Sequence, residues 1–178
     1  MRADSVTVSW EDWEGTSRQI VNVGWEHGGW TADGVVEGAN IHYVVRLDDE
    51  WRVRQFLLFR DSEEPDLWLG TDGHGRWGEV NGAHRPELDG CLDLDLACTP
   101  FTNTLPVRRL GLEVGESATL RVLMINPETL AVVPAVHRYR RTGERQWRFE
   151  WDDEDYRVDL EVDERGLVVD YPELFRRL

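Results

Sequence analysis

Two aspartates and two arginines stand close together in the segment Gly90–Leu112, which reads GCLDLDLACTPFTNTLPVRRLGL. Asp93 and Asp95 alternate with leucines, a pattern that predicts a β-strand with both carboxylates on one face. Arg108 and Arg109 follow after a run of threonine, proline and asparagine, and an arginine can bind a carboxylate through two parallel hydrogen bonds. Such a group could serve acid–base catalysis, bind a ligand or metal, or hold the fold together.

The spacing of Asp93 and Asp95 disfavours a glycosidase-type acid–base pair. Residues two apart on one strand have Cα atoms roughly 6.5–7 Å apart, and their side chains project from the same side. A retaining glycosidase needs carboxyl groups about 5–5.5 Å apart that flank the sugar from opposite faces. A hydrolase or isomerase using Asp93 or Asp95 stays as an alternative. It predicts that one carboxylate opens into a pocket and has a perturbed pKa.

Motifs for other chemistry are not found in the sequence. It contains no calcium loop, HExxH or paired CxxC, and its five histidines lack ligand spacing. It has no GxSxG nucleophile elbow, and TDGHGRWG around His74 lacks the strand–loop–helix context of a phosphate cradle. Cys91 and Cys98 are expected to be free, largely buried thiols. We therefore expect no catalytic motif, no metal and no cofactor.

Length and charge restrict the class of protein. A chain of 178 residues is expected to form one domain, residues 1–178, with its own core. The formal net charge is −15, and all 20 basic residues are arginine, which disfavours binding to nucleic acid and to anionic membrane surfaces. The sequence has no apolar run of membrane-spanning length and no signal-peptide core at its start, so we expect a cytoplasmic protein without stable membrane insertion.

Apolar and polar residues alternate along most of the chain, as in strands with one buried face. Clear examples are Ile41–Leu47, Trp147–Trp151 and Tyr156–Asp163. About a dozen strands are predicted, and only Pro172–Leu178 resembles a short helix. We therefore predict an all-β, single-domain antiparallel meander that curves into an incomplete β-barrel, with at most a short C-terminal helix. Tight turns are predicted at four dipeptides: Asp33-Gly34, Asp72-Gly73, Asn81-Gly82 and Arg165-Gly166.

A strand over 88–96 would place the leucines on one face and Asp89, Asp93 and Asp95 on the other. Three carboxylates on one face repel one another, so Arg108 and Arg109 are expected to fold back and compensate them. The segment between strand and arginines is predicted to be an irregular crossover held by charge-assisted hydrogen bonds. The sequence leaves open which face of this strand lines the barrel's concavity.

Two segments, DGCLDLDLACTPFTNTLPVRRLGL and VDERGLVVDYPELFRR, resemble the bacterial family described as "putative glycolipid-binding". That family looks like a cytoplasmic relative, in fold only, of the envelope lipoprotein carriers with open β-barrels. The resemblance implies a curved, incomplete barrel with an apolar concavity for a lipid-like ligand. The positions that match the family's central pattern are Asp93, Asp95, Thr99–Pro106, Arg108, Arg109 and Leu110.

Three functional hypotheses follow. The first is non-enzymatic binding of an amphipathic ligand, a lipid or glycolipid, with apolar walls around the chain and a polar cluster at the head group. The others are the hydrolase or isomerase, and a structural or interaction protein that presents an apolar patch or sheet edge. The sequence does not determine the oligomeric state. The predicted ligand-binding residues are Asp93, Asp95, Asn103, Arg108 and Arg109.

Overall fold

A computed structural model describes residues 5–178, which form one sheet of 14 strands. The strand order is β7-β6-β5-β4-β3-β2-β1-β14-β13-β12-β11-β10-β9-β8, and every neighbouring pair is antiparallel except β8 and β9. The outermost strands of this order, β7 and β8, are not paired with each other, so the sheet curves without closing. The predicted all-β, incomplete barrel is confirmed.

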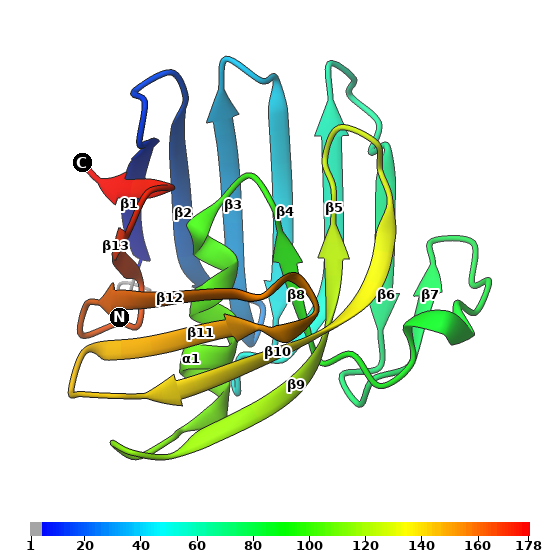
Figure 1. The fold of residues 1–178 in the computed structure, drawn as a ribbon. Coiled ribbons are helices and arrows are strands. Elements are labelled where there is room, and N and C mark those ends of the chain that lie inside the picture. Colours follow the sequence, from blue (N-terminus) through cyan, green and yellow to red (C-terminus); the bar gives the residue numbers. More distant parts are fainter. Residues whose placement is uncertain (1–4) are drawn as a thin grey trace.

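The strands fall into two groups on either side of a short helix (Figure 1). The first group is β1 (Ser5–Asp12), β2 (Arg18–Glu26), β3 (Gly29–Glu37), β4 (Ile41–Leu47), β5 (Val53–Arg60), β6 (Leu67–Thr71) and β7 (Trp77–Glu79). The second group is β9 (Ser117–Ile125), β10 (Val132–Arg141), β11 (Gln146–Trp151), β12 (Tyr156–Val162), β13 (Val168–Tyr171) and β14 (Phe175–Arg177). Between them along the chain lie β8 (Asp93–Leu96) and the helix α1 (Thr104–Leu110).

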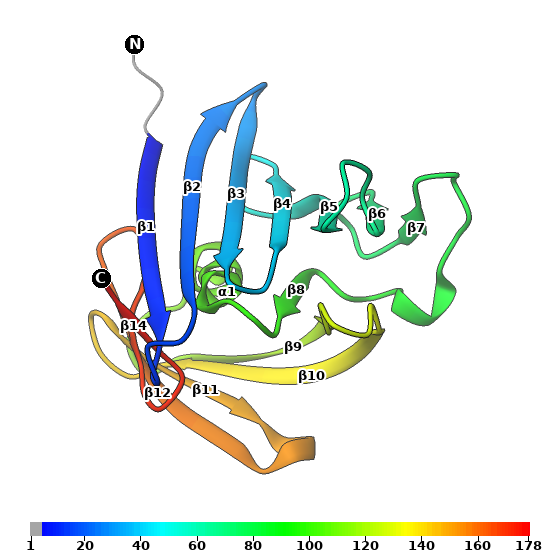
Figure 2. The same cartoon turned by 90° about the horizontal axis from the view of Figure 1, so that it is seen from above.

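The two groups form two walls, and the strands β9–β12 run across the direction of β1–β6 (Figure 1). Seen from above, α1 and β8 lie in the space between the walls (Figure 2). The helix contributes to the core on both sides, because Leu105 packs with the first wall and Val107 with the second. The interior of the curved sheet is therefore partly filled by the chain's own crossover segment.

Strand β8 lies between the two cores, and its pairing with β9 shows which of its faces meets each wall. In the parallel register Leu94 pairs with Leu123 and Asp95 with Met124. Side chains paired in this way share a face of the sheet, so the leucines join the first core and the aspartates face the second. The aspartate face is the one turned toward β10 and β11.

The predicted irregular crossover after β8 is wrong, because this segment is largely helical. A 3₁₀ turn at Pro100–Asn103 leads directly into α1, which ends at Leu110 and is followed by Gly111 with φ 59°. Pro100 lies at the start of the turn and Pro106 in the first helical turn, where a missing N–H removes no intrahelical hydrogen bond. The two prolines therefore mark where the helical segment begins.

The expected C-terminal helix is also wrong. Pro172–Leu174 form a turn in which Glu173 has φ 67°, and Phe175–Arg177 form β14. This strand pairs with both β1 and β13 and thereby joins the two walls into one sheet. Two ion pairs, Arg176 with Glu11 and Arg177 with Asp163, stabilise β14 in this position. Pairing with two strands therefore outweighs the local helix propensity of this segment.

One predicted turn lies inside a strand. Asp33 and Gly34 are central residues of β3, whereas glycines at 73, 82 and 166 have positive φ in turns as predicted. Gly34 pairs with Tyr43, and a Cβ at position 34 would lie 2.2 Å from Cζ of the Tyr43 ring. The glycine therefore provides space for a neighbouring aromatic ring rather than a turn conformation.

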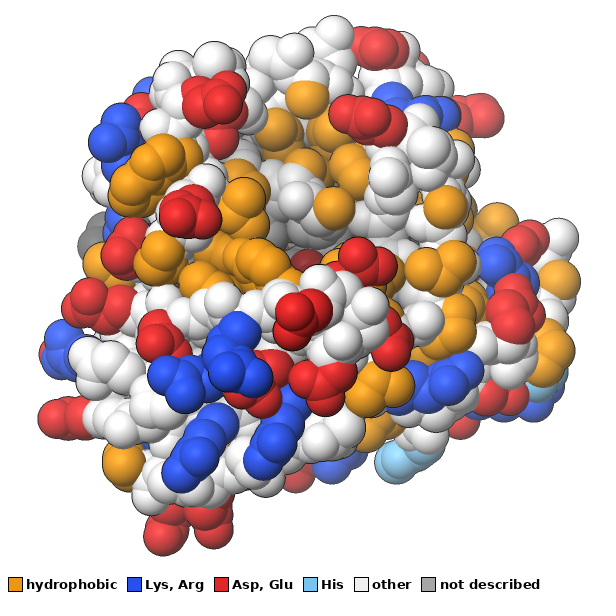
Figure 3. All heavy atoms as spheres, in the orientation of Figure 1, with side chains coloured by type: hydrophobic (Ala, Val, Ile, Leu, Met, Phe, Trp, Pro, Cys, Tyr) orange, Lys and Arg blue, Asp and Glu red, His pale blue; other side chains and the backbone are white. Residues whose placement is uncertain are grey.

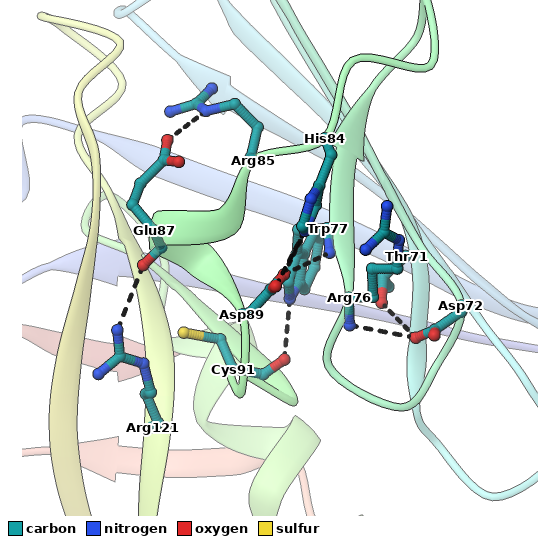
Figure 4. Close-up of polar contacts among 10 residues, drawn as sticks. All are labelled: Thr71, Asp72, Arg76, Trp77, His84, Arg85, Glu87, Asp89, Cys91 and Arg121. Atoms are coloured by element: carbon teal, nitrogen blue, oxygen red, sulfur yellow. Dashed lines mark hydrogen bonds and ion pairs between the residues drawn. The ribbon is translucent and has the colours of Figure 1, made fainter.

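The predicted strand over 88–96 is shorter than expected. Pro86–Leu88 form a 3₁₀ turn and only Asp93–Leu96 pair as a strand. Asp89 does not share the aspartate face, because its carboxylate contacts His84 Nε2 at 2.9 Å (Figure 4). In the same connection Trp77 Nε1 donates to the Cys91 carbonyl at 2.8 Å, and Arg121 Nη2 to that of Glu87 at 3.2 Å (Figure 4). These hydrogen bonds fix the conformation of the connection between β7 and β8.

Among residues 5–178, no helix has the length and apolar character needed to cross a membrane.

Candidate functional site

Two neighbouring cavities open on the concave side of the sheet. The inner cavity, about 380 Å³, lies between β8 and the second wall and includes Asp95, Asn103, Phe149, Trp151 and Tyr156. The outer cavity, about 600 Å³, lies against the first wall and includes Gln19, Val36, Ile41 and Cys98. Leu174 and Phe175 line both cavities, which makes them neighbours. In Figure 3 the molecule is hollowed above α1, with hydrophobic side chains in the hollow and acidic ones around it.

Asp95 places a carboxylate in the wall of the inner cavity. Its side chain is 20% exposed, and Oδ1 accepts a hydrogen bond from the Thr102 hydroxyl at 3.1 Å. Oδ2 lies 3.9 Å from Nδ1 of His137 on β10. Burial raises the pKa of Asp95 to about 6, and the hydrogen bond from Thr102 offsets part of this effect. The carboxyl group therefore titrates near neutrality at the surface of a cavity.

His137 lies behind Asp95 and is fully enclosed. Only 1% of it is exposed, and neither ring nitrogen has a hydrogen-bond partner among residues 5–178. Its ring packs against those of Phe149 and Trp151, with centroids 4.7 and 5.4 Å away. Burial lowers the pKa of His137 to about 4, so the imidazole is neutral at pH 7. The two ring nitrogens of His137 therefore lie next to Asp95 in an aromatic environment, without hydrogen-bond partners among residues 5–178.

Five aromatic side chains lie in the wall of the inner cavity. Trp151 at the end of β11, Tyr156 at the start of β12, and Tyr171 and Phe175 surround the opening. The indole Nε1 of Trp151 has no hydrogen-bond partner among the described residues. Burial and the neighbouring Tyr156 hydroxyl raise the pKa of Tyr171, so its phenol is neutral. The wall therefore offers ring faces together with a few hydrogen-bonding groups.

Asp93 and Arg109 form a closed pair beneath this cavity. Arg109 Nε and Nη2 donate to the two carboxylate oxygens at 3.1 and 2.6 Å, and Asp93 is 1% exposed. Burial raises the pKa of Asp93, and its bond with Arg109 opposes that shift. As predicted, an arginine compensates the charge of a β8 carboxylate. This pair ties β8 to the last turn of α1.

Asn103 lies in the cavity wall with its side chain already bonded. Its Oδ1 accepts from the Tyr139 hydroxyl at 2.8 Å and its Nδ2 donates to the Pro100 carbonyl at 3.3 Å. Arg108 lies elsewhere: its Nη1 donates to the Arg165 carbonyl at 3.1 Å, and its guanidinium packs over the Trp51 ring at 4.7 Å. It does not pair with the β8 aspartates.

Two of the five predicted binding residues, Asp95 and Asn103, line the inner cavity. Asp93 and Arg109 pair with each other below it. Arg108 lies in the last turn of α1, at the end of the helix opposite Asn103. Four other residues of this region carry no sequence signal that marks them as site residues: His137, Tyr156, Tyr171 and Phe175. Trp147 and Trp151 share the apolar face of β11: Trp147 is buried in the core, and Trp151 packs against that core while also lining the cavity. Only the position of Trp151 at the last residue of its strand could have hinted at a rim.

The two cysteines are not activated as nucleophiles. Cys91 and Cys98 are free, as predicted, and burial raises the pKa of Cys98 to about 12, so neither thiol is poised as a thiolate. Within residues 5–178 no group of three or more His, Cys, Asp or Glu side chains is arranged to hold a metal ion.

The fold and the cavities define a class of protein, an open all-β barrel with an aromatic-lined concavity. The chain belongs to the family described as "Putative glycolipid-binding", whose model matches residues 7–177. It is similar to a DUF1089 family protein from Pseudomonas aeruginosa of known crystal structure, with 31% identity and a TM-score of 0.75. That likeness covers 100% of this chain and 93% of the other. No curated protein matches the sequence.

Proposed function

We propose that the protein binds an amphipathic ligand, a lipid or glycolipid, in its two neighbouring cavities without transforming it. The observation that carries this proposal is the contact between the cavities at Leu174 and Phe175. An elongated ligand can occupy both, with its apolar part against side chains such as Val36 and Ile41 of the outer cavity. The family's description supports the same ligand class.

The polar head of this ligand is assigned to the inner cavity. Asp95 offers a carboxylate acceptor, and the indole N–H of Trp151 is a donor without a partner among residues 5–178. Ring faces of Trp151 and Tyr156 provide stacking surfaces that suit a sugar or another flat polar group. Asp93, Arg109 and Asn103 keep β8 and α1 in place and thereby position Asp95.

Native mass spectrometry of the protein purified from its host without detergent tests the proposal. The expected result is a bound small molecule that extracts into organic solvent and rebinds the stripped protein. Ala97→Trp, which enlarges a residue of the inner cavity wall, should abolish rebinding. Ala118→Trp, on a half-buried residue of β9 outside both cavities, is the matched control. A repeatedly ligand-free protein that rebinds no lipid from host extract would contradict the proposal.

A second candidate is the hydrolase or isomerase, and one observation favours it: Asp95 lines a cavity and has a raised pKa. In that case Asp95 would act as general acid or base, and incubation with host lipid extract would change the mass of the bound molecule. Asp95→Asn would stop this change without removing the molecule. Recovery of an unaltered ligand from the wild type at long times would exclude the second candidate.

A further inference from the structure

A smaller cavity, separate from the two described above, lies beyond the C-terminal end of α1. Its volume is about 250 Å³. One part of its wall is apolar and the other cationic, and the residues involved are Val23, Trp30, Trp51 and Leu167 together with Arg108 and Arg165. The helix separates it from the inner cavity, because Asn103 lies just before α1 and Arg108 in its last turn.

The charge of this wall is the reverse of that of the whole chain. The protein has 35 acidic and 20 basic residues, yet no carboxylate lines the small cavity. Four larger cavities each have at least two acidic residues in their walls. Because unlike charges attract, an anion is favoured in a cavity with two arginines and no acid in its wall over cavities whose walls contain carboxylates.

Trp51 forms part of this wall in an unusual conformation. It lies in the β4–β5 turn with φ 65°, a left-handed conformation that is rare for bulky residues and costs about 1–3 kcal/mol. Its side chain is nevertheless buried, 7% exposed, with its ring centroid 5.4 Å from that of Trp30. Its indole Nε1 has no hydrogen-bond partner among residues 5–178. The indole ring, fixed in this conformation, forms an aromatic wall of the cavity beside Arg108.

Arg108 brings further donors to the same place. Its guanidinium lies over the Trp51 ring and uses Nη1 to bond the Arg165 carbonyl. The carboxylate that acts on it most is Asp163, which is held by Arg177 Nη1 at 2.7 Å and by two backbone amides. No carboxylate of the described chain lies within ion-pair distance of Arg108, so the guanidinium is available to an anionic ligand.

We propose that this cavity is a second binding site, for a small carboxylate with an apolar body. The carboxylate lies against the guanidinium of Arg108, which is a donor in the cavity wall beside the Trp51 ring and can hold a carboxylate through several hydrogen bonds. The apolar body packs on Trp30, Val23 and Leu167. This site does not depend on the lipid-binding proposal, because it lies at the other end of α1.

Two-dimensional NMR of the tryptophan indole N–H groups, with 3-phenylpropionate as the probe, tests this assignment. The expected result is a shift of the Trp51 signal, identified with Trp51→Phe, while the signal of Trp151 in the inner cavity stays in place. The amide 3-phenylpropionamide, which lacks the charge, is expected to bind at least about tenfold more weakly. A shift of Trp151 instead of Trp51, equal binding of the amide, or no shift at millimolar probe would overturn the proposal.

Variants supply a second measurement. Arg108→Gln keeps most of the side-chain length and is expected to weaken binding of 3-phenylpropionate by about tenfold or more. Arg140→Gln, an exposed arginine of β10 away from the cavity, removes the same charge and is expected to leave binding within about twofold. Equal effects of the two substitutions would show nonspecific attraction and refute the site. The NMR measurement on the wild type decides the matter if Arg108→Gln unfolds.

Discussion

Nδ1 of His137 lies 3.9 Å from Oδ2 of Asp95, and the two side chains have opposite preferences for protons. Burial raises the pKa of Asp95 to about 6 and lowers that of His137 to about 4, so in the folded state the carboxyl keeps its proton to a higher pH than an exposed aspartate does, and the imidazole stays neutral to a lower pH than an exposed histidine does. Since Asp95 lines the inner cavity and His137 is enclosed behind it, this pair links the proposed ligand site to the stability of the fold.

The first prediction concerns the pH dependence of stability. A carboxyl with a raised folded-state pKa contributes stability below its unfolded pKa near 4 and loses it as pH rises through about 6. Asp95→Asn should therefore stabilise the protein at pH 7 by about 1–3 kcal/mol relative to wild type, and the difference should vanish near pH 4. Urea unfolding between pH 4 and 7.5 measures it.

Asp61→Asn, at an exposed position of the β5–β6 connection, is the control for the removed charge and should change stability by less than about 0.5 kcal/mol. His137 acts in the opposite direction, because its lowered pKa makes stability fall as pH drops from about 6.5 through about 4. An Asp95→Asn protein that loses stability at pH 7 would show that the carboxylate is better satisfied than its environment suggests.

The second prediction concerns the buried ion pair of Asp93 and Arg109. Removing one partner, as in Arg109→Met, leaves the other charge buried and should cost about 3–5 kcal/mol in the free energy of unfolding. The double variant Asp93→Leu/Arg109→Met removes both charges and should be less destabilised than the sum of the single variants. Thermal and urea unfolding of the four proteins measures this coupling. Additive losses would mean that the two groups do not depend on one another.

The third prediction concerns the packing of Tyr43 on Gly34. Gly34→Ala places a Cβ 2.2 Å from the Tyr43 ring and should destabilise the protein by about 1–3 kcal/mol. Displacement of that ring also disturbs its hydroxyl contact with Thr99, 3.1 Å away, next to the start of α1. Gly24→Ala on β2 is the matched control, since its Cβ would meet only Ser5 Cβ at 3.8 Å. Equal stabilities of the two variants would refute the packing explanation.

The fourth prediction concerns Leu174, which lines both cavities. Leu174→Asp introduces a charge at the apolar junction and should reduce binding of the neutral dye Nile red by about tenfold, because burying one leucine side chain contributes about 1.5–3 kcal/mol. Leu178→Asp, 57% exposed and outside both cavities, should leave dye binding unchanged. Fluorescence titration measures both. If Leu174→Asp binds the dye as well as wild type does, the two cavities do not form the ligand site.

The sequence was sufficient to predict the class of fold and most of its strands. Alternation such as that of Tyr156–Val162 depends only on which side of a strand is buried, so it can be read locally. Turns at Asn81-Gly82 and Arg165-Gly166 were also predicted correctly, because their backbone angles suit few residues other than glycine. The family resemblance rested on the same local patterns.

Features that depend on distant neighbours were not predictable in this way. Gly34 resembled a turn residue until Tyr43 was placed beside it, and Phe175–Arg177 resembled a helix until β1 and β13 were found on either side. For the site, the sequence identified Asp95 and Asn103 but neither Tyr156, which lines the cavity, nor His137, which is enclosed behind Asp95. Both residues belong to the second wall, and the sequence pattern does not show how that wall lies relative to β8.

What the sequence alone determined was the set of strands and the presence of carboxylates and arginines around β8. The tertiary structure decided their different environments: Asp93 closed in an ion pair, Asp95 open to a cavity, and Arg108 at the far end of α1. The physical reason is that strand periodicity fixes only the face on which a side chain projects. The curvature of the sheet and the path of α1 determine what that face meets.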